Sequence, residues 1–139
     1  MSAMKINTVV FCDDIRQEVG GKVTLVGAYT PELNASKIPV TIPVAVWVVL
    51  SPDKMGDFKF NLKIEDPDKN QILKGEIAGT FSASAITSLA IPQMPVIVSK
   101  TGTYKFSIKE DGGSKWHMLG VLKLNYVAAV MPNPTSPIA

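Results

Sequence analysis

Residues 57–65 read Asp-Phe-Lys-Phe-Asn-Leu-Lys-Ile-Glu, and this stretch decides the fold class. Apolar and polar side chains alternate through it, so that the apolar residues share one face and the polar residues share the other. A repeat of two residues is the spacing of a β-strand with one buried face, because successive side chains in a strand point to opposite sides of the sheet. A helix would distribute the same apolar side chains around its circumference. The stretch therefore predicts a half-buried strand.

Turn residues and further extended stretches surround this strand. Residues 66–70 read Asp-Pro-Asp-Lys-Asn, which favours a turn, and residues 71–81 continue as the second arm of a hairpin. Residues 44–50 are apolar on both faces and suit a central, covered strand, while Pro39 and Pro43 place the residues before them on an edge or at a bulge. Further extended stretches are residues 5–11, 15–19, 22–29, 104–109 and 115–127.

Glycine-rich turns join several of these stretches. Gly20 and Gly21 lie between two of them, and the turn after residue 110 reads Asp-Gly-Gly-Ser. Both are typical of β-hairpins. In the last stretch, a strict alternation would place Trp116 and Met118 on the same face as Leu122.

These patterns predict an all-β protein with seven or eight strands, arranged as a single antiparallel β-sandwich that is immunoglobulin-like or C2-like in appearance. The one place for a short helical turn is residues 82–89. A chain of 139 residues has the usual size of one domain. We expect the β-sandwich domain over residues 1–131 and a proline-rich C-terminal tail, with a frayed end, over residues 132–139.

Composition restricts the classes of partner. Fourteen Lys and Arg residues against twelve Asp and Glu residues leave a net charge of +2, far below the concentrated positive charge of a dedicated nucleic-acid binder. The apolar stretch near the N-terminus is too short for a signal peptide, and the uncharged residues 77–99 contain too many polar and proline residues for a membrane helix. We therefore expect a cytoplasmic protein that has no membrane partner and binds no nucleic acid.

Two stretches resemble a known family. Residues 12–16, Cys-Asp-Asp-Ile-Arg, and residues 21–29, Gly-Lys-Val-Thr-Leu-Val-Gly-Ala-Tyr, resemble the opening of a bacterial family of functionally uncharacterised β-sandwich proteins, a domain of unknown function. Residues 102–108, Gly-Thr-Tyr-Lys-Phe-Ser-Ile, are similar to its penultimate strand. The resemblance implies a β-sandwich. Because that family has no assigned activity, it implies no catalytic or ligand-binding residues.

No catalytic motif is present in the sequence. The nucleophile elbow, the dinucleotide fingerprint and the phosphate-binding loop are all missing. His117 is the single histidine, which excludes a two-histidine metal centre within one chain. Cys12, the single cysteine, could pair with it as a nucleophile with its base, but nothing in the sequence brings the two together. We expect a protein that is not an enzyme and that holds no cofactor and no metal.

Acidic residues provide two candidate ligand sites. Asp13, Asp14 and Arg16 fit either a cation or anion site at a strand end, or a bend that the Asp side chains organise while Arg16 pairs locally. Asp66 and the residues after it begin with the spacing of a calcium loop, but Gln71 stands where that loop needs glycine, so an EF-hand is excluded. A looser calcium site in the acidic end loops is an alternative.

Lysines gather on the polar face of two predicted hairpins. They would form a basic stripe if their strands share a sheet, and we interpret them as a solvated face that also guards against edge pairing. The stripe has no interleaved aromatic residues, which a platform for single-stranded nucleic acid needs for stacking. These residues are Lys59, Lys63, Lys105 and Lys109.

The second half of the uncharged segment, residues 86–98, is apolar but interrupted by prolines. One interpretation is a loop that folds over the open end of the sandwich and joins the core. In the other, Leu89, Ile91 and Met94 form a contact surface for a protein partner or another subunit. The leading hypothesis is therefore a non-enzymatic binding or assembly module that contacts a protein partner or itself, and the alternative is a module that binds a small ligand or calcium through its acidic end loops.

Overall fold

The computed structural model describes residues 4–30, 32–52, 54–82 and 86–127. This part of the chain contains nine strands and no helix. The all-β prediction is therefore confirmed, and the number of strands is higher than the seven or eight that the sequence predicts. Among these residues, none form a helix of the length and apolar character that crossing a membrane requires. The strands are β1 (Lys5–Gln17), β2 (Val23–Ala28), β3 (Glu32–Ala35), β4 (Val40–Ser51), β5 (Gly56–Glu65), β6 (Gln71–Phe81), β7 (Thr87–Val98), β8 (Gly102–Glu110) and β9 (His117–Tyr126).

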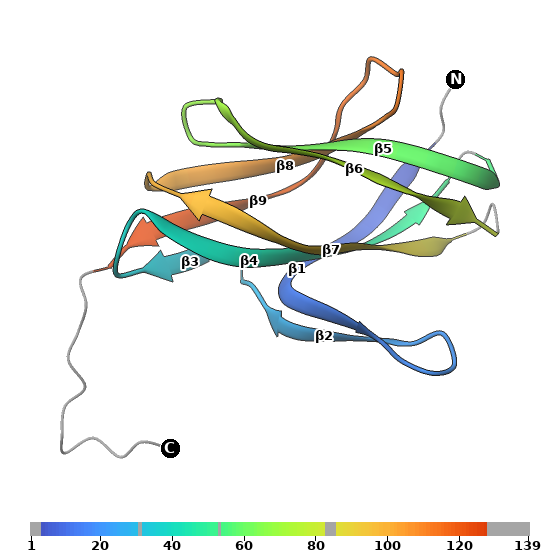
Figure 1. Ribbon diagram of the computed structural model, residues 1–139, viewed down its shortest axis with the longest axis horizontal. Coiled ribbons are helices and arrows are strands. Elements are labelled where there is room, and N and C mark those ends of the chain that lie inside the picture. The colour runs from blue at the N-terminus through green and yellow to red at the C-terminus, as the bar shows by residue number, and fades with distance from the viewer. Residues whose placement is uncertain (1–3, 31, 53, 83–85, 128–139) are drawn as a thin grey trace.

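The strands form two sheets that lie over one another (Figure 1). The four-stranded sheet has the order β2-β1-β4-β7, the five-stranded sheet has the order β3-β9-β8-β5-β6, and neither closes into a barrel. All neighbouring strands are antiparallel except β3, which runs parallel to β9. The expectation of a purely antiparallel arrangement is wrong at this pair. The chain crosses from one sheet to the other between β2 and β3, so β3 does not fold back on its predecessor as a hairpin would.

The hydrophobic core lies between the sheets and is built from alternate residues of the long strands. Phe11 of the four-stranded sheet packs on Phe106 of the five-stranded sheet, with ring centroids 4.7 Å apart. Gly120 makes room for this contact, because a Cβ atom there would lie 2.9 Å from the Phe11 ring. Burial of one such aromatic side chain contributes about 1.5 to 3 kcal/mol.

The hairpin of β1 and β2 follows the glycine prediction. Gly20 and Gly21 both have positive φ, and Glu18 N donates to Lys22 O at 2.8 Å across the turn. In Figure 1 this hairpin, in blue, reaches away from the two layers. The bend expected at Asp13 does not break the strand, because β1 continues from the sheet into the hairpin.

Residues 87–98 form the strand β7, and the expectation of a proline-broken loop is wrong. β7 pairs with β4 from one end to the other, with a bulge where Pro92 and Gln93 lie opposite Ala45. Proline is tolerated here because β7 is an edge strand and one of its sides has no ladder to complete. No helical turn is found in the described part of residues 82–89; residues 83–85, like the predicted tail at 132–139, lie outside the described residues.

Candidate functional site

β6 and β7 are the edge strands on one side of the molecule, one from each sheet (Figure 1). A groove of about 480 Å³ runs between them. β6 contributes Leu73, Gly75 and Ile77 to its wall, and β7 contributes Met94. Leu62 of the neighbouring strand β5 also lines the groove, and because Leu62 is a core residue, the floor of the groove is continuous with the hydrophobic core.

The outer edge of β6 carries backbone groups that β5 does not use. Asp111 N donates to Lys59 O at 2.9 Å, which shows that the odd-numbered residues of β5 point their backbone groups toward β8. The even-numbered residues of β5 therefore bond to β6, where their partners are Leu73, Gly75 and Ile77. Lys74 and Glu76, which lie between these partners, and Ala78, which follows them, present their N–H and C=O groups to the free edge, and a bulge at Ile72 ends this alternation.

The outer edges of β2, β3 and β7 are less suited to pairing, and the two further stretches that have a strand on one side only, residues 5–10 of β1 and residues 117–122 of β9, are six residues long each. β7 lacks two N–H donors at Pro92 and Pro95 and carries a bulge. β3 has four residues, and β2 has six and includes Gly27, whose φ is +63°. Prolines, bulges and short length are the means by which proteins protect an edge strand. β6 has eleven residues and no proline, and its bulge lies at Ile72 near the start of the strand, so the edge from Leu73 onward is regular.

The predicted contact residues Leu89, Ile91 and Met94 separate in the structure. Leu89 and Ile91 point into the core, with 7% and 1% of their surface exposed. Met94 is half-buried and lines the groove. A partner can therefore reach Met94. The side chains of Leu89 and Ile91 are part of the core, which agrees with the interpretation that this segment joins the core.

The predicted ligand residue Asp13 belongs to a hydrogen-bonded network on the four-stranded sheet. Tyr29 Oη donates to Asp13 Oδ1 at 2.5 Å and lies 2.7 Å from the carbonyl oxygen of Pro43 on β4. Gln93 Nε2 of β7 donates to the backbone oxygen of Asp13 at 2.7 Å. Burial, and then the hydrogen bond to Asp13, raise the pKa of Tyr29. Asp13 is thus bound through its carboxylate to Tyr29, in the segment after β2, and through its backbone oxygen to β7.

Asp14 and Arg16 interact locally. Asp14 Oδ1 accepts a hydrogen bond from the backbone of Ile15 at 2.9 Å, and Arg16 Nε lies 3.9 Å from Asp14 Oδ2 at an exposed position. An exposed pair at this distance contributes little to stability. This is the local pairing of Arg16 that the sequence analysis gives as the alternative to an ion-binding site.

Cys12 and His117 lie in different sheets. Cys12 is fully buried, its Sγ atom contacts the carbonyl oxygen of Ala45 at 3.7 Å, and burial raises the pKa of the thiol. His117 begins β9 in the five-stranded sheet, opposite Ile108. A buried thiol with a raised pKa is a weak nucleophile. The described geometry does not pair these two residues.

The acidic turn after β5 is organised around Asp66. Asp66 Oδ1 accepts hydrogen bonds from the backbone N–H groups of Asp68 and Asn70, both at 2.9 Å. The bond from Asn70 is the main cause of the lowered pKa of Asp66. Lys100 Nζ lies 2.5 Å from Asp68 Oδ2 and 3.5 Å from Asp66 Oδ2. The ammonium group of Lys100, from the turn before β8, therefore supplies the positive charge beside the Asp66 and Asp68 carboxylates. Within the part of the chain that the structure describes, no three His, Cys, Asp or Glu residues gather as metal ligands.

The four predicted stripe lysines do share the outer face of the five-stranded sheet, since β5 and β8 are neighbours. Acidic residues interrupt the stripe: Lys105 lies opposite Glu65, and Lys59 Nζ lies 3.4 Å from Glu76 Oε2. Trp116 also lies on this face, with Lys63 Nζ 4.2 Å from its ring centroid. The prediction that Trp116 and Met118 share a face with Leu122 is wrong. A bulge in β9 shifts the alternation, so that Met118 is 57% exposed.

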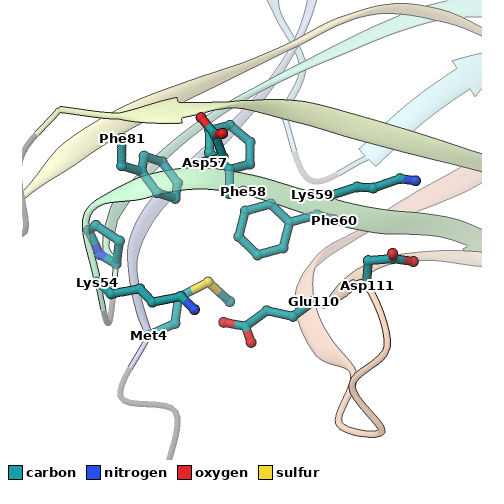
Figure 2. A pocket seen from close by; sticks show the side chains of 10 residues that line it. Met4, Lys54, Asp57, Phe58, Lys59, Phe60, Phe81, Glu110 and Asp111 are labelled. Carbon is teal, nitrogen blue, oxygen red and sulfur yellow. The ribbon is translucent and has the colours of Figure 1, made fainter.

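A second hollow lies at one end of the molecule and measures about 260 Å³. Figure 2 shows the rings of Phe58, Phe60 and Phe81 along one side, with Lys54 and Glu110 on the other. Phe58 stacks on Phe81 with centroids 4.2 Å apart. The hollow therefore combines an aromatic wall with a charged rim.

Sequence comparison adds a family to this description. The fold and the open β6 edge define a two-sheet β-protein. Residues 7–119 match a family described as Family of unknown function (DUF6941), and the chain belongs to this family. The matched region runs from β1 into β9 and includes β6 and β7. No curated protein matches the chain.

The open edge of β6 was missed by the sequence interpretation. Residues 71–81 were recognised as a strand, and their lack of proline was visible in the sequence. The sequence of this strand could not show that it lies at an edge, because strand order decides which strands lie at an edge. Strand order follows from contacts between segments that are distant in the sequence.

Proposed function

We propose that this chain is a non-enzymatic assembly module that accepts an additional β-strand at the free edge of β6. One observation carries the proposal: eleven residues of backbone lie open at a sheet edge beside an apolar groove. An added strand would bond to the unused N–H and C=O groups, and its side chains would cover Leu73, Ile77 and Met94.

We also propose a finer description of the fold, in which the two sheets form a β-sandwich. A sandwich of immunoglobulin-like or C2-like type is supported by the core that both sheets share and by the contact of Phe11 with Phe106. A cytoplasmic location is supported by the single, buried, free cysteine, since a protein without disulfides is stable in a reducing compartment.

A site-specific photo-crosslinker tests the assembly proposal. The reactive residue replaces Ala78, whose side chain lies on β6 beside the free edge, or Lys105, which is exposed on β8 of the same sheet and has a strand on either side. After irradiation of cells that produce each variant, we expect a covalent adduct of defined mass from position 78 and none from position 105. Equal adducts from both positions, or none from position 78, would contradict strand addition at β6.

The end hollow supports a second candidate function, the binding of a small amphipathic molecule. Its volume is slightly below the range of about 300 to 1,000 Å³ that is usual for ligand pockets, so the molecule would be small. A thermal-shift screen of small aromatic acids and amines tests it. A shift in melting temperature that the Phe81→Ala variant loses supports binding here, and no shift across the screen rejects it.

A further inference from the structure

We propose that the strand added at β6 comes from a second copy of the same chain, and that the two β6 strands pair antiparallel about a two-fold axis at Gly75. This inference rests on the proposed function. It concerns the identity of the partner and the register of the pairing, and both follow from the order of residues along the edge.

The backbone permits this register. Lys74 and Glu76 both present their N–H and C=O groups to the free edge, as the pairing of β6 with β5 requires. An axis at Gly75 places Lys74 opposite Glu76 of the second copy, and residues that face each other with both groups form a hydrogen-bonded pair. Lys74 and Glu76 of each copy form two such pairs, which gives about four backbone hydrogen bonds between the copies, and the bulge at Ile72 ends the regular ladder there.

The charges select this register. With the axis at Gly75, each Lys74 lies opposite a Glu76 on the same outer face, and the two-fold symmetry produces this pair twice. A shift of the axis to Lys74 would place two lysines opposite each other, and a shift to Glu76 would do the same with two glutamates. Like charges directly opposite one another are destabilising. Glu76 retains Lys59 as a neighbour in its own chain, at 3.4 Å.

The apolar side chains agree with the charges. On the inner face, this register sets Leu73 opposite Ile77 of the second copy, and both residues line the groove. On the outer face, Ile72, which is 38% exposed, would lie near Ala78 of the second copy, just beyond the paired residues. Gly75 leaves space at the axis, since a Cβ atom there would meet nothing within 4 Å. The exposed apolar surface along β6 would therefore be covered by the same surface of the other copy.

Charge reversal combined with sedimentation equilibrium tests the register. We expect the wild type to dimerise, and we expect Lys74→Glu or Glu76→Lys alone to weaken the dimer about 10- to 100-fold, since each places like charges opposite each other twice. The double variant restores opposite charges and should recover the wild-type dissociation constant. A mixture of the two single variants should form a heterodimer, because one chain then carries two acidic residues and the other two basic residues.

Lys105→Glu is the matched control, with the same charge change on the outer face of the same sheet but two strands away from β6. We expect it to leave the dissociation constant within about twofold of the wild type. If the wild type is monomeric at all concentrations, the second copy is excluded, whereas a crosslink from position 78 to another protein would leave strand addition intact. If the wild type dimerises but neither the double variant nor the mixture recovers what the single variants lose, the register is wrong.

Discussion

Replacement of Tyr29 by phenylalanine should destabilise the protein through the loss of a single hydroxyl group. Tyr29 Oη donates to Asp13 Oδ1 at 2.5 Å and lies 2.7 Å from Pro43 O, so it connects the segment after β2 to both β1 and β4. A hydrogen bond to a charged group contributes about 1.5 to 3 kcal/mol, and the partial exposure of Tyr29 places the expected loss near the lower end, at about 1.5 kcal/mol.

Urea denaturation followed by intrinsic tryptophan fluorescence measures this loss. Tyr126→Phe is the control, because its side chain is 55% exposed and its hydroxyl can be solvated in both states; its free energy of unfolding should change by less than about 0.5 kcal/mol. A double-mutant cycle of Tyr29→Phe with Asp13→Ala should give a coupling energy of about 1 kcal/mol. If the two tyrosine variants unfold at the same urea concentration, the hydroxyl network does not stabilise the fold.

The same bond predicts a dependence on alkaline pH. The pKa of Tyr29 is raised in the folded protein, so its contribution to stability is fully present below the pKa of about 10 of an unfolded tyrosine and is lost as the pH rises above that value. The free energy of unfolding of the wild type should therefore decrease more steeply above pH 10 than that of Tyr29→Phe. Parallel curves would refute the assignment.

Three further predictions follow from close contacts, from the acidic turn and from burial. Gly79→Ala should lower the melting temperature, because its Cβ atom would lie 2.7 Å from the Phe58 ring, whereas Gly75→Ala, with nothing within 4 Å, should change it little at concentrations where the protein is monomeric. The pKa of Asp66 is lowered in the folded state, so its contribution is present above the unfolded pKa and is lost as the pH falls through the folded pKa; stability below pH 4 should decrease more steeply in the wild type than in Asp66→Asn, as an acid titration of the circular dichroism signal would show. Cys12 should react with a chromogenic disulfide reagent only after denaturation, and rapid labelling of the native protein would contradict its burial.

The all-β class could be predicted because it depends on local alternation. In residues 57–65 every apolar side chain that the pattern assigned to the core side lies there, and Phe60, Leu62 and Ile64 are each at most 2% exposed. The hairpin at Gly20 was predictable for the same reason, since both glycines adopt the positive φ that a tight turn needs.

The failures involve bulges and strand order. A bulge in β9 exchanged the faces on which Trp116 and Met118 lie, and a bulge in β7 let Pro92 enter a strand. A single extra residue reverses the alternation beyond it, and the sequence carries no local mark of where that residue will be inserted. The position of β6 at an edge depends on contacts between distant segments, so no single stretch could reveal it.

The two prolines of β7 also bear on how large an assembly this chain can build. A molecule with one pairing edge, joined to a copy of itself by a two-fold axis, uses up that edge and stops at two subunits. A molecule with two such edges could add subunits at either side and grow into a fibre. Pro92 and Pro95 lie on the strand that would supply the second edge, beside its bulge. Residues that carry an N–H at these two positions would remove one of the two features that keep a dimer from growing into an open-ended polymer, and the bulge would be the one left.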